Sequence, residues 1–357
     1  MRAAASSRTA QRTLASFVGQ RWAVLFLVLE LVIFSFIGGG FFSLNGFSIV
    51  LFYSTTLALL ATAETFVIVT GGIDLSVGFV MGFASVVSAK LAGGLSAAGM
   101  GAGASLTLAI LITLLIGLLP GMVNGLLVAR LRVPAFLATF AVQGITYGIS
   151  LLLTGGSAAI NVPNLANVIG NGYFLYLVPG HGVFFFLRPD VARGTTVFEI
   201  IPTMVVVTVL VVAVAAFVLG RTRFGRHTYA IGGNMDAAVR AGINTRRHLV
   251  VVYVLSSLLA TLSGIIYMME FVTGKSDAGS SFMLDAVVAV VIGGASLFGG
   301  TGSVWRTILG VLILSVLEMG LKMSGVQTFD KYIAVGVILI FAVLIDQFFP
   351  ELVHKED

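Results

Sequence analysis

The chain has 357 residues, of which 58% are hydrophobic and only 10% are charged, and its mean hydropathy is +1.08. An ordinary soluble domain carries about 25% charged residues, so this composition excludes a soluble globular protein. The absence of cysteine excludes disulfides and thiolate chemistry. A net charge of +5 could suggest a nucleic-acid partner, but the distribution of the charges favours a membrane protein without one.

Apolar runs about as long as a bilayer is thick recur along the whole chain. In hydrocarbon each backbone N–H and C=O must be paired within its own segment, so runs of about 20 apolar residues predict transmembrane helices. We predict an all-α integral membrane protein with a single transmembrane domain, residues 1–357, and ten spans. The expected spans are 22–42, 47–69, 74–92, 104–128, 135–153, 198–219, 249–270, 284–298, 306–321 and 331–349.

The basic residues predict the orientation of these spans. With the N-terminus inside, fourteen of the 20 lysines and arginines fall on the inner side, which follows the positive-inside rule. Both termini are then cytoplasmic, with 1–21 as an inner N-terminal segment, 154–197 as an outer loop and 220–247 as an inner loop. Ten spans are compatible with two related groups of five, as in inverted repeats. Within the outer loop, the broken apolar run 173–187 predicts an interfacial or re-entrant hairpin.

Glycines mark two kinds of special position. Gly117, Gly121 and Gly125 recur every four residues in the fourth span, which predicts close approach of a second helix, and Pro120 predicts a kink there. The segment Thr70–Gly78 predicts a break between the second and third spans.

Within that break, Gly71 and Gly72 allow a sharp turn, and Asp74 is placed to cap the next helix by accepting the N–H near Val77. An interrupted helix that lines a transport route is the alternative interpretation. Gly293 and Gly294 predict a similar break after the eighth span.

Several carboxylates fall inside or at the edge of the expected spans, namely Glu30, Glu64, Glu270, Asp285 and Glu318. A charge at the bilayer centre costs about 2.5–3.5 kcal/mol on insertion scales, so it tends to face a cavity or a partner. For Glu64 we favour a role in the pathway or in a structural hydrogen bond over a proton relay. Glu270 and Asp285 are alternatively boundary residues in contact with outer water.

Polar and aromatic residues recur at helical spacing on the fifth and seventh spans. Such stripes suit a neutral polar solute such as a sugar, although they more often hold helices together. The candidate pathway residues are Glu64, Asn124, Phe140, Gln143, Tyr147, Tyr267 and Glu270.

The inner loop carries six arginines around a helical stretch, Met235–Ala241. A short helix rich in small residues favours a docking element, whereas the topology rule alone already explains a basic inner loop. The chain contains no nucleotide-binding P-loop, no zinc spacing and no nucleophile elbow, so we predict no catalytic residue, no metal site and no ATP hydrolysis by this chain alone.

From about residue 50 onward the chain resembles the permease subunits of ribose-type sugar ABC importers. The segments that carry this resemblance are Thr70–Gly78, Met122–Arg130, Val133–Thr139, Gly225–Asn234, Ala241–Asn244, Leu284–Val287 and Val291–Gly300. The resemblance implies a bacterial or archaeal plasma or inner membrane location and a dimer with a second permease, identical or paralogous. It also implies cytoplasmic ABC ATPase subunits that bind ATP-Mg, and an extracytoplasmic sugar-binding protein.

The same resemblance implies that the short inner helix is the coupling helix that docks on the ATPase. The residues assigned to it are Asn234, Asp236, Ala237, Ala238, Arg240 and Gly242, with Asp236 in place of the usual Glu. Two other functions stay open on the residues alone. One is a proton-coupled secondary transporter of a small polar solute that uses Glu64 or Glu270, and the other is a membrane scaffold or sensor.

Overall fold

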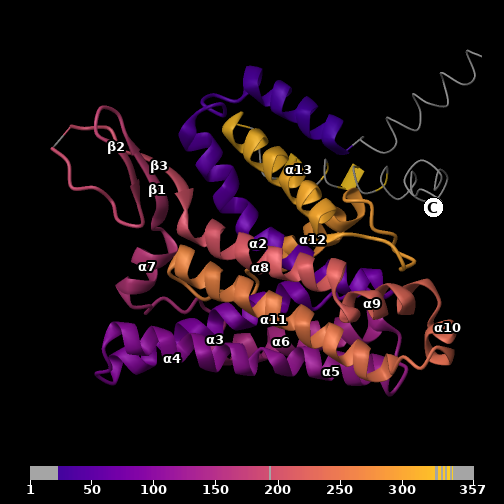
Figure 1. Cartoon of the computed structure of the whole chain (residues 1–357). Helices are drawn as coiled ribbons and strands as arrows, with labels where there is room; N and C mark the ends of the chain where they lie inside the picture. Colours follow the sequence, from indigo (N-terminus) through magenta and orange to yellow (C-terminus); the bar gives the residue numbers. More distant parts are fainter. Residues whose placement is uncertain are drawn as a thin grey trace, which may run out of the picture.

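The computed structural model describes residues 23–192 and 194–325, together with 329, 330, 333, 336, 337 and 340. Its main part is a bundle of apolar helices (Figure 1). In chain order these are a first helix, Ala23–Ile37, then α2 (Leu44–Val69), α3 (Val77–Ala97), α4 (Ala102–Ile116), α5 (Leu118–Ala129), α6 (Ala135–Thr154), α8 (Thr203–Arg221), α11 (Thr245–Phe271), α12 (Ser280–Ile292) and α13 (Val304–Met323).

Seven spans in the described part are long and apolar enough to cross a bilayer, with α4 and α5 counted as one span of 28 residues. They match seven of the predicted spans and make the chain an integral membrane protein. The helix Ala23–Ile37 and α12 are shorter. The 13 residues of α12 rise only about 20 Å, so the predicted eighth span 284–298 is too long at its C-terminal end. The tenth, 331–349, lies almost wholly outside the described residues, so the count of ten stays a prediction.

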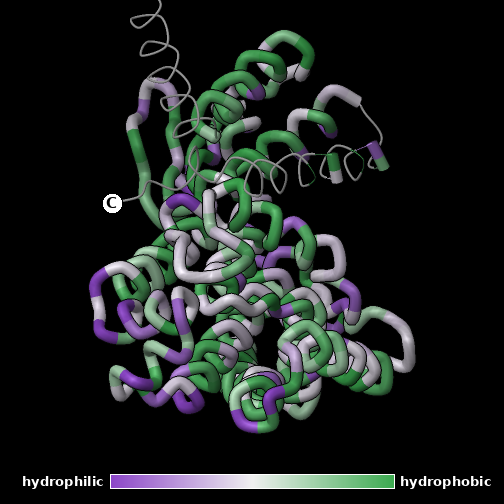
Figure 2. The backbone as a smooth tube through the Cα atoms, turned by 90° about the vertical axis from the view of Figure 1, so that its right-hand side faces the viewer, coloured by the Kyte–Doolittle hydropathy of each residue, from purple (hydrophilic) through white to green (hydrophobic). Residues whose placement is uncertain are grey.

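The two ends of the bundle carry different structures. The short helices α9 (Arg223–Gly233) and α10 (Met235–Arg240) lie at one end, and α7 (Asn164–Gly170) lies at the other with a small sheet (Figure 1). Seen from the end of α9 and α10, the helices are mostly hydrophobic and hydrophilic segments mark several of the connections (Figure 2).

The sheet lies in the loop 154–197 and its junction with α8. Its antiparallel strands β1 (Tyr173–Val178), β2 (Gly182–Phe185) and β3 (Phe198–Pro202) have the order β2-β1-β3. The predicted hairpin is therefore a β-hairpin, turned at Gly180 and Gly182, both with positive φ. The all-α prediction holds for the membrane helices and was wrong for this loop, because its aromatic residues favour strands once a turn pairs them.

The helices α2 and α11 form the centre of the bundle. They are the longest, with 26 and 27 residues, and in each 67% of the most apolar stretch is buried inside the protein. They pack against each other, and α11 also packs against α3 and α5. The remaining helices therefore surround a pair that is largely shielded from lipid.

The predicted glycine contact is confirmed on α4 and α5, where it faces α11. A Cβ at Gly117 would overlap the side chain of Thr261, one at Gly121 would lie 2.6 Å from the Cβ of Ser257, and one at Gly125 would lie 2.6 Å from the Cα of Val250. The hydroxyl of Ser257 donates to the carbonyl oxygen of Gly117 at 2.6 Å. Helix backbones thus touch directly where lipid offers no hydrophobic drive for association.

Pro120 has a stronger effect than the predicted kink. The helix is interrupted at Gly117, so that α4 ends at Ile116 and α5 begins at Leu118. Proline has no N–H to donate to the carbonyl four residues earlier, that of Ile116, which explains a break at this point.

We expect Gly121→Ala to lower the stability of the purified protein by about 1–3 kcal/mol, because the added methyl overpacks the α5–α11 contact. Gly148→Ala is the matched control, since a Cβ at this half-buried position in α6 meets no atom within 4 Å. The midpoint of thermal unfolding, monitored by fluorescence-detected size exclusion, is measured for both variants. Equal midpoints for the two variants would show that the glycine contact does not contribute to stability.

Candidate functional site

Two non-helical segments interrupt the bundle from opposite ends. The first, 70–76, joins α2 to α3, and the second, 272–279, joins α11 to α12. Both carry the pattern Thr-Gly-x-x-Asp, ending at Asp74 and Asp277, and in both the next helix begins three residues after the aspartate. This internal repeat was present in the sequence and was missed by the predictions above.

The second segment runs back along α3 and brings the starts of α3 and α12 together. A Cβ on Gly78 would overlap the carbonyl oxygen of Gly279, and a Cβ on Gly82 would overlap that of Ser276. The hydroxyl of Ser85 accepts from the backbone N–H of Lys275 at 3.0 Å and donates to its carbonyl at 3.1 Å. Irregular backbone inside a membrane protein is tolerated where protein groups pair it in this way.

The first segment is held by a buried aspartate. Asp74 is 1% exposed, and its Oδ1 accepts from the backbone N–H of Ser76 at 3.0 Å and from the Ser76 hydroxyl. Its Oδ2 accepts from the hydroxyl of Ser256, in α11, at 2.8 Å. The carboxylate was predicted to accept an N–H near Val77, and the donor is the N–H of Ser76, the residue directly before Val77. The contact with Ser256 fixes this segment to the central helix.

Glu64 and Asn124 complete a buried polar cluster around Asp74. The backbone N–H of Asp74 lies 3.4 Å from Glu64 Oε2, and Asn124 Nδ2 donates to the Ser76 hydroxyl at 2.9 Å. Glu64 and Asn124 are both 0% exposed. Within the described part of the chain, Glu64 Oε1 and Asn124 Oδ1 accept no hydrogen bond. The structure thus brings two predicted pathway residues to the break, but both are enclosed.

Tyr267 and Glu270 form a separate group at the opposite end of α11. The Thr55 hydroxyl donates to Glu270 Oε1 at 3.3 Å, and Asn171 Nδ2 donates to the Glu270 carbonyl at 2.9 Å. Glu270 is 6% exposed and Asp285 is 3% exposed, so both side chains are enclosed by the protein.

The other pathway candidates lie on an open face of α6. Phe140 and Tyr147 are 56% and 36% exposed, while Gln143 is partly buried. Phe140 stacks on Phe136 with ring centroids 6.1 Å apart. The ring of Tyr147 meets that of Phe79 edge to face, with centroids 5.2 Å apart. Only 28% of the most apolar stretch of α6 is buried in this chain, which leaves this face free to meet lipid or another subunit.

The residues of the predicted coupling helix form α10, at the arginine-rich end. Asn234 caps it by accepting the N–H of Ala237 at 2.9 Å, and Gly242 turns the chain after it with φ of 83°. Ala238 is 3% exposed, whereas Asp236, Ala237 and Arg240 are exposed. The helix is thus anchored on one side and open on the other.

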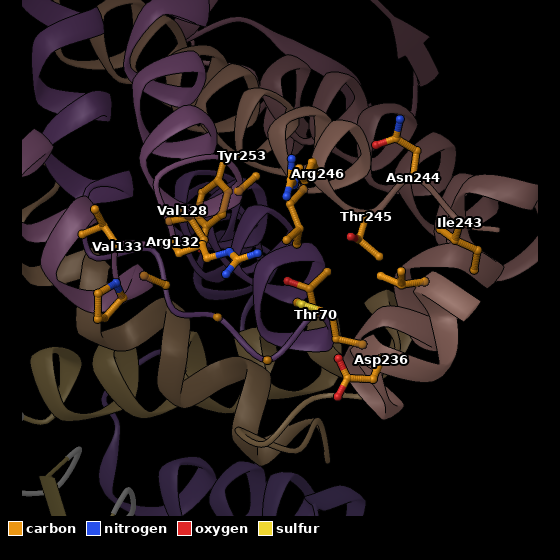
Figure 3. Close-up of a pocket in the computed structure, with 18 residues that line it drawn as sticks. Thr70, Val128, Arg132, Val133, Asp236, Ile243, Asn244, Thr245, Arg246 and Tyr253 are labelled. Carbon is orange, nitrogen blue, oxygen red and sulfur yellow. The ribbon is translucent and has the colours of Figure 1, made fainter. Parts of the chain in front are cut away.

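A cavity of about 830 Å³ lies between α10 and the break at Thr70–Gly72. Arg132, in the connection after α5, and Arg246, in α11, extend into it, and Asp236 lies across from them on α10 (Figure 3). Tyr253 lines it from α11 (Figure 3). The cavity therefore connects the coupling segment with the first interruption of the bundle.

Comparison with known proteins identifies the family. Residues 46–345 match the family described as branched-chain amino acid transport system / permease component. The chain belongs to this permease family. It is accordingly a multi-pass protein of the plasma or inner membrane and is not itself an enzyme. No solved structure matches the permease significantly.

Similar proteins match from 81% to 94% of the permease. It is 34% identical to the ribose import permease protein RbsC of Escherichia coli (strain K12), over 94% of this chain and 95% of the relative. It is 36% identical to the ribose import permease protein RbsC of Bacillus subtilis (strain 168), over 81% and 80%. It is 33% identical to the fructose import permease protein FrcC of Rhizobium meliloti, over 91% and 84%.

We expect Ser256→Ala to destabilise the permease by about 1–3 kcal/mol, because it removes a donor from a buried carboxylate. Ser150→Ala is the matched control, since Ser150 is equally buried but donates only within its own helix, to Thr146. Thermal unfolding in detergent compares the two variants. Similar losses would mean that the Asp74 contact has no special role in holding the break.

Proposed function

We propose that the chain is the membrane-spanning permease subunit of an ATP-driven sugar importer, which forms the translocation pathway and couples to a separate ATPase. The observation that carries this proposal is the full-length similarity to ribose and fructose import permeases. The proposed assembly contains a second permease, identical or paralogous, cytoplasmic ABC ATPase subunits with bound ATP-Mg, and an extracytoplasmic sugar-binding protein.

In the proposed orientation, the end with α9 and α10 faces the cytoplasm. The arginines of the segment 220–247 support this orientation through the positive-inside rule, and the sheet and α7 then lie outside. The two Thr-Gly-x-x-Asp breaks at opposite ends of α2 and α11 support an inverted five-plus-five arrangement of ten spans.

The short helix α10 is the proposed ATPase contact. Its exposed side chains include the apolar Met235 and Val239, 45% and 53% exposed, next to Asp236 and Arg240. An apolar centre with charged neighbours is the usual composition of a protein–protein contact. The buried Ala238 fixes α10 to the permease, so that a force on the exposed side moves the helix as a unit.

The open face of α6 is the proposed wall of the sugar pathway. Aromatic rings at Phe140 and Tyr147 suit the C–H faces of a sugar. Gln143 lies between them on the helix, but its Oε1 is buried and accepts no hydrogen bond within the described part of the chain. A pathway between two permease subunits would cover this face, which one chain alone leaves exposed. Asn124, Glu64 and Glu270 are enclosed, and their contacts favour a structural role over direct contact with sugar.

One observation favours a different function, a proton-coupled transporter of a small polar solute. Glu64 and Glu270 are buried carboxylates, and neither takes part in the ion pairs found among the described residues, which join Arg188 to Glu199 and Lys275 to Asp277. Buried carboxylates without a basic partner are typical of proton sites in carriers.

Reconstitution separates the two functions. We expect proteoliposomes that contain the permease, its ATPase and its binding protein to accumulate at least one of ribose, fructose and xylose when ATP is present. We expect the permease alone to accumulate none of them. Uptake by the permease alone, driven by a pH gradient, would contradict the importer and support the carrier.

Ala237→Trp tests the proposed ATPase contact. We expect it to weaken retention of the ATPase roughly tenfold, or about 1.4 kcal/mol, because the indole projects from the exposed side of α10. Ala98→Trp is the control, an exposed alanine at the end of α3 near the outer side. Affinity co-purification measures both, and equal retention would remove α10 from the contact.

A further inference from the structure

Three glycine-containing segments meet at the proposed cytoplasmic end of the bundle. They are Val69–Gly71 at the end of α2, Gly232 at the end of α9, and Gly299–Gly300 in the connection between α12 and α13. The backbone N–H of Gly300 donates to the carbonyl of Val69 at 2.9 Å. We name this contact the glycine junction and define it by Val69, Gly71, Gly232, Gly299 and Gly300.

The junction has no room for side chains between its backbones. A Cβ on Gly232 would overlap the Val69 carbonyl oxygen and lie 2.6 Å from the Gly300 nitrogen. A Cβ on Gly299 would lie 2.8 Å from the Gly71 nitrogen and 3.1 Å from the Gly232 oxygen. Gly299 and Gly300 also have φ of 89° and 79°, which L side chains rarely adopt. The three segments therefore contact each other through their backbones.

A side-chain hydrogen bond ties α9 to the same connection. The hydroxyl of Tyr229 donates to the carbonyl of Gly302 at 2.8 Å. Burial raises the pKa of Tyr229 above its ordinary value, so the hydroxyl stays protonated and able to donate near neutral pH. Tyr229 and Gly232 thus hold α9 to the α12–α13 connection at two points one helical turn apart.

Each segment of the junction continues into an element with a proposed role in transport. The α9 segment continues directly to α10, which begins at Met235. The α2 segment continues into the break that holds Asp74, and the third segment lies between α12 and α13. Side chains can absorb a displacement by changing rotamer, but a packed backbone contact cannot, so it transmits movement to its neighbours.

We propose that the glycine junction is the positioning element that passes movement of α10 to the interruption 70–76 and to the α12–α13 connection, 293–303. This inference rests on the proposed function, because it requires an ATPase that moves α10. It assigns Gly232 and Tyr229 to coupling rather than to docking or to sugar contact. ATP-driven movement of α10 should therefore displace Phe298, which directly precedes Gly299 in the α12–α13 connection. This displacement should occur even in the absence of sugar.

The chain offers a direct experiment. It contains no cysteine, and Phe298 is 82% exposed in the α12–α13 connection. In the Phe298→Cys background, a maleimide fluorophore reports movement of this connection in nanodiscs that hold the permease with its ATPase. We expect ATP to change the fluorescence, and we expect Gly232→Ala to reduce that change roughly fivefold or more while ATPase binding is kept.

Gly233→Ala is the matched control, because a Cβ on this neighbouring glycine meets no atom within 4 Å. It should respond to ATP like the parent. Tyr229→Phe removes only the oxygen that binds Gly302 and should reduce the response, which keeps the test valid if Gly232→Ala fails to accumulate. A parent that binds ATPase but shows no ATP response would overturn the inference, as would a full response in Tyr229→Phe or in Gly232→Ala. Loss of ATPase binding by every variant and by the parent would instead contradict the proposed function.

Discussion

The whole arrangement depends on one constraint, that a backbone polar group inside a membrane needs a partner. Continuous helices meet this constraint by themselves, but the two interruptions of this bundle do not. Each is therefore paired by side chains from neighbouring helices. The N–H of Asp74 points to Glu64, that of Leu75 to the hydroxyl of Thr139 at 3.1 Å, and that of Lys275 to the hydroxyl of Ser85. The breaks are possible only because α2, α6 and α3 supply these acceptors.

The need to pair the backbone of the first break explains the position of Glu64 in α2. A carboxylate in the bundle centre is costly, and it is retained where it accepts from a backbone N–H that no helix can satisfy. Asn124 supports the break indirectly. It donates to the Ser76 hydroxyl, and that hydroxyl donates to Asp74. Glu64 and Asn124 thus support the irregular backbone around Asp74, which is the structural hydrogen-bond role that the sequence allowed for Glu64.

Local patterns were predictable from the sequence, and features that depend on distant partners were not. The glycines at 117, 121 and 125 were sufficient to predict a close helix contact, because their spacing alone places them on one face. That α11 is the partner depends on tertiary packing. The short α12 was overestimated because apolar composition continues past Ile292, while the structure ends the helix at Gly293. The strands of the outer loop were missed because their pairing is set by a turn between aromatic runs of no clear period.

The repeated Thr-Gly-x-x-Asp pattern shows how one local sequence serves two environments. In both copies the aspartate precedes a helix start by three residues, so its position relative to the next helix is the same. The surroundings then separate their roles, since Asp74 is enclosed and held by Ser256, whereas Asp277 is partly exposed and paired with Lys275 at 3.3 Å. In the proposed importer, the interruption fixed to the central helix lies towards the cytoplasm and next to the glycine junction, and the more open one lies towards the binding protein. In that proposal, two breaks that enter the bundle from opposite ends of the central helix pair correspond to the discontinuous helices typical of inverted-repeat transporters.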